Sequence, residues 1–245
     1  MSDSHPSYLA HQFDSLEQQR QASTLGMWLF LITEIMFFGG LFAGYIIYRS
    51  QYPEAFIVGS HLLDMKWGGF NTIVLLLSSL TMVLAVHGAQ VGKKNVAAAW
   101  LIATMVLGLI FLGVKVIEYG SKFEHLLVPG PNFHFDPGHL EHYVQKAEGP
   151  LAFLYVAGEH FQHALSIVNP KNVQLFYTFY FTMTGMHAIH MIIGEGIMLC
   201  MLINTLKGKY HADYYNPLEI SGLYWHFVDI VWIFLFPLLY LIGRH

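Results

Sequence analysis

Charged side chains are scarce in this chain. Asp, Glu, Lys and Arg make up 11% of its 245 residues, whereas soluble domains carry about 25%. Apolar residues make up 55%, so too few charges remain to cover a water-facing surface. We therefore predict an integral membrane protein. The formal net charge of −4 gives no reason to expect nucleic-acid binding, which needs a basic surface.

Cysteine is almost absent as well. Cys200 is the single cysteine, which excludes a disulfide within the chain and a cysteine cluster for iron–sulfur or structural zinc. The first 22 residues are polar, and the apolar run after them is longer than the core of a signal peptide. We expect this first apolar helix to remain in the mature protein.

Long apolar runs, in contrast, are plentiful. A helix needs about 20 apolar residues to cross a bilayer. The sequence predicts an all-α, integral membrane helical bundle (residues 23–245) behind a cytoplasmic tail (residues 1–22), with Ser23 or Thr24 capping the first helix. The five transmembrane helices are expected at residues 24–49, 67–91, 96–123, 173–206 and 218–242.

Two connections between these helices differ in length. Residues 51–66 read as a polar linker, and residues 125–170 form a long insertion with several prolines. Within the insertion we expect short surface helices at 140–146 and 151–167, neither of them a membrane span.

The lysines indicate an orientation. Lys93, Lys94, Lys207 and Lys209 lie in the two shortest connections, and short loops rich in Lys and Arg stay on the cytoplasmic side. We therefore expect a cytoplasmic N-terminus and place the 125–170 insertion on the outer side.

Ionisable residues inside the apolar runs are the candidates for function. Glu34 has apolar residues on both sides, and a charge at such depth costs about 2.5–3.5 kcal/mol on insertion scales. It should face the protein interior, be paired or be protonated. The other candidates are His87, Lys115, Glu118, His187, His190, Glu195, His226 and Asp229.

Three interpretations of these residues compete. His187 and His190 lie three apart and share a helix face, so with Glu34 or Glu195 they could bind a metal. The groups could instead form a proton or transport path. Alternatively they pair between helices, as Lys115 and Glu118 can do at their spacing of three. The pattern favours pairing for most of the set and a functional role for Glu34.

Several segments together resemble a known family. They are LGMWLFLITEIMFFGGLFAGYIIYR, GFNTIVLLLSSLTMVLAVHGA, KVIEYGSKF, FYTFYFTMTGMHAIHMIIG and GLYWHFVDIVWIFLFPLLY, in this order. This set resembles subunit III of the heme-copper oxidases, cytochrome c oxidase subunit III. Because the chain starts directly at the carboxylate helix, it is similar to the short bacterial form with five helices.

The resemblance implies a role for particular residues. Glu34 matches a buried glutamate that reacts with a carbodiimide and supports proton uptake. His187 and His190 match the family's paired histidines, one of which is expected to hydrogen-bond toward Glu34. An interhelical polar network is predicted from His87, Glu118, Glu195, Glu219, His226 and Asp229.

The resemblance also implies the surroundings of the chain. It is expected to carry no catalytic centre and no metal, with heme and copper in partner subunits, and to bind membrane lipids such as phospholipid. It should contact oxidase subunit I directly, and subunit II and other oxidase subunits in the same complex. The 125–170 insertion departs from the family pattern, so we expect a cytochrome or another respiratory complex to contact it.

The predicted function is therefore that of a non-catalytic subunit of a cytochrome c oxidase in the bacterial cytoplasmic membrane. Such an enzyme passes electrons from cytochrome c to O₂ and pumps protons. One alternative is the homologous subunit of a quinol oxidase or nitric oxide reductase. A stand-alone membrane metalloenzyme or transporter is a further alternative from a different class.

Overall fold

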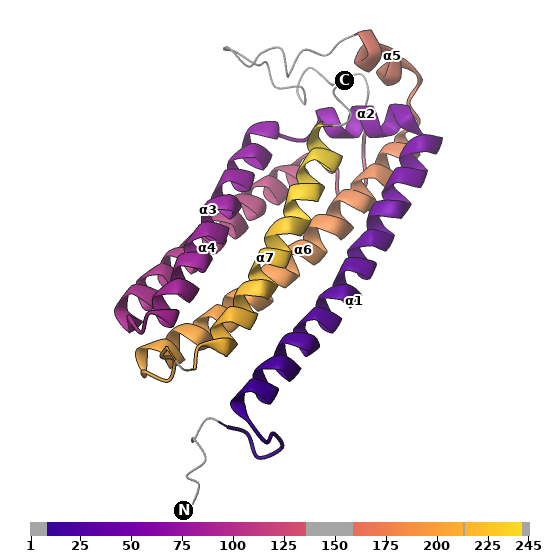
Figure 1. The fold of residues 1–245 in the computed structure, drawn as a ribbon. Coiled ribbons are helices and arrows are strands. Elements are labelled where there is room, and N and C mark those ends of the chain that lie inside the picture. The colour runs from indigo at the N-terminus through magenta and orange to yellow at the C-terminus, as the bar shows by residue number, and fades with distance from the viewer. Residues whose placement is uncertain (1–8, 136–158, 213, 242–245) are drawn as a thin grey trace, which may run out of the picture. The chain divides into compact units, whose positions relative to one another are not determined.

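The computed structural model describes residues 9–135, 159–212 and 214–241. In these ranges the elements are α1 (Leu16–Gln51), α2 (Pro53–His61), α3 (Met65–Gln90), α4 (Lys94–Glu124), α5 (Glu159–Ile167), α6 (Pro170–Leu206) and α7 (Asn216–Phe236), followed by the π-helix η3 (Pro237–Leu241) (Figure 1). The only extended pairing among the described residues is an isolated bridge between His211 and Tyr214. The prediction of an all-α fold is confirmed.

Among the described residues, five helices are long and apolar enough to cross a membrane. They are α1, α3, α4, α6 and the continuous helix formed by α7 and η3. Helix α5 has nine residues, which at 1.5 Å per residue is far too short to span a bilayer. The predicted number of spans is therefore confirmed. The predicted helix at 140–146 and the first part of the one at 151–167 lie outside the described residues.

Helix α1 begins at Leu16, inside the predicted tail, where the sequence also allows a helix near Leu16–Arg20, and it continues without a break into the first membrane span. Ser15 Oγ accepts a hydrogen bond from the Gln18 amide at 3.2 Å, and Gln18 Oε1 accepts one from the Asp14 amide at 2.8 Å. This reciprocal capping satisfies amide groups that a helix N-terminus otherwise leaves open. Ser23, predicted as a cap, instead donates to the Gln19 carbonyl within the helix at 2.8 Å.

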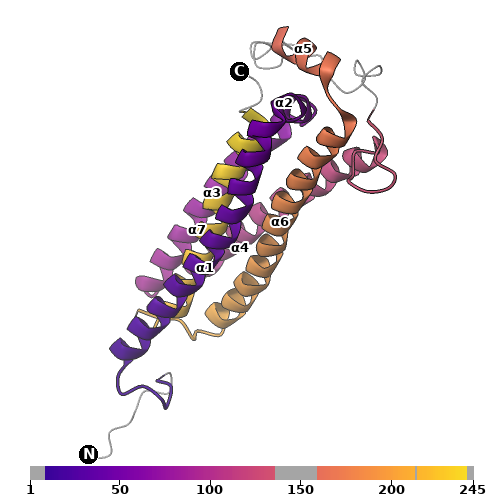
Figure 2. The same ribbon diagram turned by 90° about the vertical axis from the view of Figure 1, so that its right-hand side faces the viewer.

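Helix α2 occupies much of the predicted polar linker 51–66. Pro53 lies at the start of the helix, a position where its missing amide hydrogen costs nothing. Phe56 and Val58 are buried, so this segment has an apolar face that the polar residues around it concealed. The ring of His61 lies 4.6 Å from that of Phe161, and α2 and α5 lie close together in both views of the fold (Figure 2).

The chain divides into two compact units, each built from segments of several helices. Unit 1 comprises Met1–Phe37, Leu76–Gly108 and His190–Asp229. Its interior centres on Trp225, which is fully buried and whose indole nitrogen donates to Ser78 Oγ at 2.9 Å. Gly108 and Gly194 flank this indole: a Cβ added at either glycine would approach a ring carbon to 2.9 Å. Two glycines thus make room for a fully buried tryptophan.

Unit 2 comprises Phe38–Leu75, Leu109–Ile189 and Ile230–His245. Its core is rich in aromatic rings that meet edge to face. Phe56 contacts Tyr45 and Phe176 in this way, with ring centroids 5.0 Å and 5.5 Å apart. Such edge-on pairs add about 0.5–1.5 kcal/mol each beyond the area they bury. Gly59 of α2 allows the Phe176 ring to approach, because an added Cβ would overlap it.

Candidate functional site

A carboxylate and an imidazole meet inside unit 1. His190 Nε2 of α6 lies 3.0 Å from Glu34 Oε2 of α1. The Glu34 side chain is 19% exposed and that of His190 11% exposed, so the pair is largely but not fully enclosed. The hydroxyl of Tyr224 in α7 donates to the His190 carbonyl at 3.0 Å. Residues from three helices therefore meet here, and a carboxylate–imidazole pair can hold and release a proton.

A groove runs beside this pair. It encloses about 450 Å³ and is lined by Met27, Phe30, Glu34, His190, Ile193, Ile197, Ser221 and Tyr224. Phe30 and Ile193 are 40% and 51% exposed, so the groove opens on the surface of unit 1. Its walls are mostly apolar, and its polar groups are concentrated at Glu34, His190, Ser221 and Tyr224.

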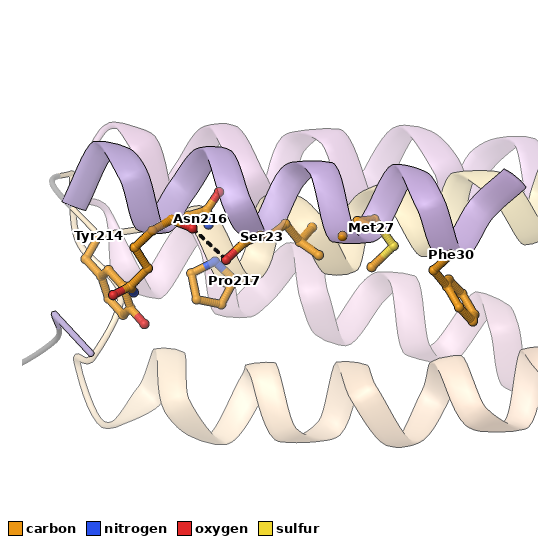
Figure 3. Close-up of a pocket in the computed structure, with 9 residues that line it drawn as sticks. Ser23, Met27, Phe30, Tyr214, Asn216 and Pro217 are labelled. Carbon is orange, nitrogen blue, oxygen red and sulfur yellow. Dashed lines mark hydrogen bonds between the residues drawn. The ribbon is translucent and has the colours of Figure 1, made fainter. Parts of the chain in front are cut away.

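A second hollow adjoins this groove. It shares Met27 and Phe30 with it and extends to Gln19, Ser23, Gly26, Tyr214, Asn216, Pro217 and Ile220. Figure 3 shows Ser23, Met27 and Phe30 on α1 facing the side where Tyr214, Asn216 and Pro217 lie. Together the two hollows lead from a polar end near the start of α1 to the Glu34–His190 pair.

The other predicted histidine of α6 has different neighbours. His187 is fully buried in unit 2, where its ring lies 5.3 Å from Phe111 and 5.2 Å from Trp232. The spacing of three had suggested a metal shared by His187 and His190. Within the described ranges, no group of three His, Cys, Asp or Glu residues lies close enough to hold a metal ion.

Three further candidates lie in unit 1, with Glu195 and Asp229 buried and His226 half-buried. His226 Nδ1 is 2.7 Å from Ser79 Oγ, which joins α7 to α3. The carboxylates of Glu195 and Asp229 have no hydrogen-bond partner in the part of the chain that the structure describes. Glu195 fits against Gly108, where an added Cβ would overlap its carboxylate oxygen. Asp229 lies near Ser79, whose hydroxyl is engaged with His226.

His87 and Glu219 take no part in these contacts. His87 is exposed and Glu219 is half-buried, and their side chains form no hydrogen bond among the described residues. The residues predicted as one interhelical network thus occupy separate places: Glu118 in unit 2, and the others in unit 1.

A polar cluster in unit 2 surrounds Glu118. Lys115 Nζ donates to Glu118 Oε2 at 2.8 Å, the pair expected from their spacing. Tyr240 OH donates to Glu118 Oε1 at 2.5 Å, and Lys115 also lies 3.4 Å from Tyr180 OH and 5.1 Å from the centre of the Trp232 ring. All of these side chains are buried.

Sequence reasoning missed the two tyrosines of this cluster. Both stand in apolar runs, where a tyrosine is typical of an interfacial belt. The signal that could have pointed to them is the spacing of Lys115 and Glu118, two oppositely charged residues three apart on an apolar helix. A buried ion pair needs further hydrogen-bond partners, and nearby tyrosines can supply them.

The fold and these sites define a multi-pass helical membrane protein with a carboxylate–base pair in each of its two units. The family model described as cytochrome c oxidase subunit III matches residues 12–125 and 151–244. The chain therefore belongs to the subunit III family of the heme-copper oxidases. Members of this family are subunits of an oxidoreductase complex, so this chain associates with other oxidase subunits.

Individual relatives have narrower descriptions. The chain is 28% identical to a probable quinol oxidase subunit 3 of Staphylococcus haemolyticus, over 94% of each chain. It is 29% identical to the protein of the same description from Staphylococcus epidermidis and 27% identical to that from Staphylococcus aureus, over 97% of each chain. These matches span nearly the full length of both partners.

Proposed function

We propose that this chain is the non-catalytic subunit III of a quinol-oxidising terminal oxidase in a bacterial cytoplasmic membrane. Full-length similarity to probable quinol oxidase subunits supports a quinol donor, in place of the cytochrome c favoured by the sequence alone. In this proposal heme and copper belong to partner subunits, subunit I packs directly on this chain, and the N-terminus is cytoplasmic.

The proposed task of the chain is to support proton uptake into subunit I. The observation that carries this role is the contact between Glu34 and His190, 3.0 Å apart and partly exposed. A carboxylate inside a membrane helix is expensive to keep. One that is paired with a titratable base and still reachable from outside is suited to taking up and passing on protons.

The donor is tested on the intact complex, purified through a tag on this chain. We expect a heme-containing oxidase that consumes O₂ with a reduced quinol and shows no turnover with reduced cytochrome c. Turnover with cytochrome c alone would overturn the quinol assignment, and a colourless single chain would overturn the role as an oxidase subunit.

The proton-uptake role is tested by Glu34→Gln in the same complex. We expect slower proton uptake after a pulse of O₂, with heme content unchanged. The matched control is Glu124→Gln, which alters an exposed carboxylate at the end of α4. Equal proton-uptake rates in the two variants would contradict this role.

The 125–170 insertion is proposed as a contact for a partner protein. Among its described residues, Leu126 and Ile167 are apolar and 50% and 56% exposed. Replacing both by Ser should weaken the association of the oxidase with a cytochrome or another respiratory complex. Unchanged co-purification and unchanged turnover would reject this contact.

A further inference from the structure

We propose that the groove beside Glu34 binds the ring of a lipid-soluble quinol. This inference rests on the proposed function, since it assumes that the complex meets a quinol in the membrane. It adds a binding site on subunit III itself, made by residues of α1, α6 and α7.

The groove has the size and walls that such a ring needs. Its volume of about 450 Å³ falls in the range of small-molecule sites, about 300–1,000 Å³. The rings of Phe30 and Tyr224 lie with their centroids 6.2 Å apart, tilted by 33° to each other, and provide an aromatic side. Met27 adds an adaptable thioether surface, which suits a flat apolar ligand.

The polar groups of the groove are mainly acceptors. The Ser221 hydroxyl donates to the Pro217 carbonyl at 2.8 Å, and that of Tyr224 donates to the His190 carbonyl. Both hydroxyl protons are thereby committed, and the lone pairs of the two oxygens remain to accept. An ionised Glu34 is also an acceptor, with capacity beyond its single contact to His190. Such a groove favours a ligand that donates hydrogen bonds.

A quinol has two hydroxyl donors, whereas its oxidised quinone has only carbonyl acceptors. The arrangement of acceptors therefore favours the reduced form. Among the residues that line the groove, only the ring of His190 could donate an N–H to a quinone oxygen. Its Nε2 already contacts the Glu34 carboxylate. The groove should therefore bind a quinol more tightly than the corresponding quinone.

The same chemistry disfavours a phospholipid headgroup. Phosphate is bound in proteins by Arg, Lys and backbone amides, and none of the described residues that line the groove is Arg or Lys. Glu34, when ionised, would repel a phosphate. Phospholipid, which the family resemblance allowed at this chain, is therefore the alternative occupant that the experiment must distinguish.

Access to the groove is from the membrane phase. Phe30 and Ile193, half-exposed on its rim, belong to helices long and apolar enough to span the membrane. A quinol dissolved in the bilayer can therefore reach Glu34 without passing through water. The exposed rim also offers a position, Ile193, at which a larger side chain would close the groove.

The test uses the whole oxidase complex and a photoreactive azido-quinone in its reduced form. We expect label on peptides of this chain that contain residues 27–34, 190–197 or 221–224, with unlabelled quinol competing better than quinone. Ile193→Trp should remove most of this label. The control Ile192→Trp alters the neighbouring residue, which is 59% exposed and does not line the groove, and should leave labelling intact.

A second variant guards against misfolding. Ser221→Ala removes one acceptor whose own hydrogen bond is to its helix backbone, and it should reduce labelling while heme content stays normal. The inference is overturned if a complex that oxidises quinol carries no label in these peptides. It is also overturned if Ile193→Trp, but not Ile192→Trp, displaces a tightly bound phospholipid instead. A complex without quinol turnover would refute the proposed function, and the O₂ assay detects that separately.

Discussion

The Glu34–His190 pair of unit 1 and the Lys115–Glu118 pair of unit 2 differ in how completely they enclose a carboxylate. Each holds a carboxylate beside a nitrogen base within helices that are otherwise apolar. Glu118 has Lys115 on one oxygen and Tyr240 on the other, and its side chain is 2% exposed. Glu34 has one partner and remains 19% exposed beside a groove. A closed, fully bonded centre is suited to holding helices together, and an open one to exchange with a ligand or proton.

The largest effect is expected from breaking the closed pair. Glu118→Gln leaves the Lys115 ammonium buried without its counter-charge, which costs about 3–5 kcal/mol in comparable pairs. Thermal unfolding in detergent should show a strong loss of stability. Glu124→Gln, at an exposed site on the same helix, should stay within about 0.5 kcal/mol of the parent.

A double variant separates the lost pair from the stranded charge. Lys115→Met added to Glu118→Gln removes the uncompensated ammonium and should recover much of the lost stability. If the double variant is no more stable than Glu118→Gln alone, the closed pair does not act as described.

The next effect concerns the packing around Trp225. A methyl group at Gly108 would overlap the Glu195 carboxylate and press on the indole, and such overpacking costs about 1–3 kcal/mol. Gly113→Ala on the same helix meets no atom within 4 Å. It should be neutral or slightly stabilising, because Ala favours helix over Gly by about 0.8–1 kcal/mol. Equal unfolding temperatures for the two variants would contradict the close packing of Glu195 and Trp225 against Gly108.

How far the sequence could predict these features depends on the range of the interaction. Apolar runs predicted the spans because a bilayer sets the helix length, and the spacing of three predicted the Lys115–Glu118 pair because it is local to one helix. The start of α1 is local too, and the sequence allowed a helix near Leu16–Arg20, but the polar residues there gave no sign that this helix continues into the membrane span. The apolar face of α2 was hidden in the same way.

Contacts between helices were out of reach of periodicity alone. The spacing of His187 and His190 indicated a shared face, but the structure gives them different partners: aromatic rings for His187 and Glu34 for His190. The fit of Glu195 against Gly108, and the tyrosines around Glu118, depend on which helices pack together. Family resemblance indicated that one of the two histidines hydrogen-bonds toward Glu34, because it carries information on packing that a single sequence lacks, and the structure shows that this histidine is His190.

A smaller effect compares one tyrosine from each centre. Tyr240→Phe removes a hydrogen bond to the Glu118 carboxylate, and bonds to charged groups contribute about 1.5–3 kcal/mol. Tyr224→Phe removes a bond to the His190 carbonyl, a neutral pair worth about 0.5–1.5 kcal/mol. Unfolding midpoints of the two variants should therefore rank Tyr240→Phe as the more destabilised. The reverse order would place the stronger structural link in unit 1.

The smallest effect on stability, and the sharpest chemical contrast, is expected for the open pair. Glu34→Gln keeps the shape of the side chain and a polar contact to His190, so the change in unfolding free energy should stay below about 1 kcal/mol.

A hydrophobic carbodiimide added to the intact complex should nevertheless modify Glu34, because the groove opens on the surface of membrane-spanning helices. The oxygens of Glu195 are fully enclosed and those of Glu118 are both hydrogen-bonded, so these two carboxyl groups should stay unmodified. Peptide mapping by mass spectrometry distinguishes all three sites in one experiment. Modification of Glu118 at a rate similar to that of Glu34 would show that the closed centre opens as readily as the groove, and the functional contrast between the two units would then fail.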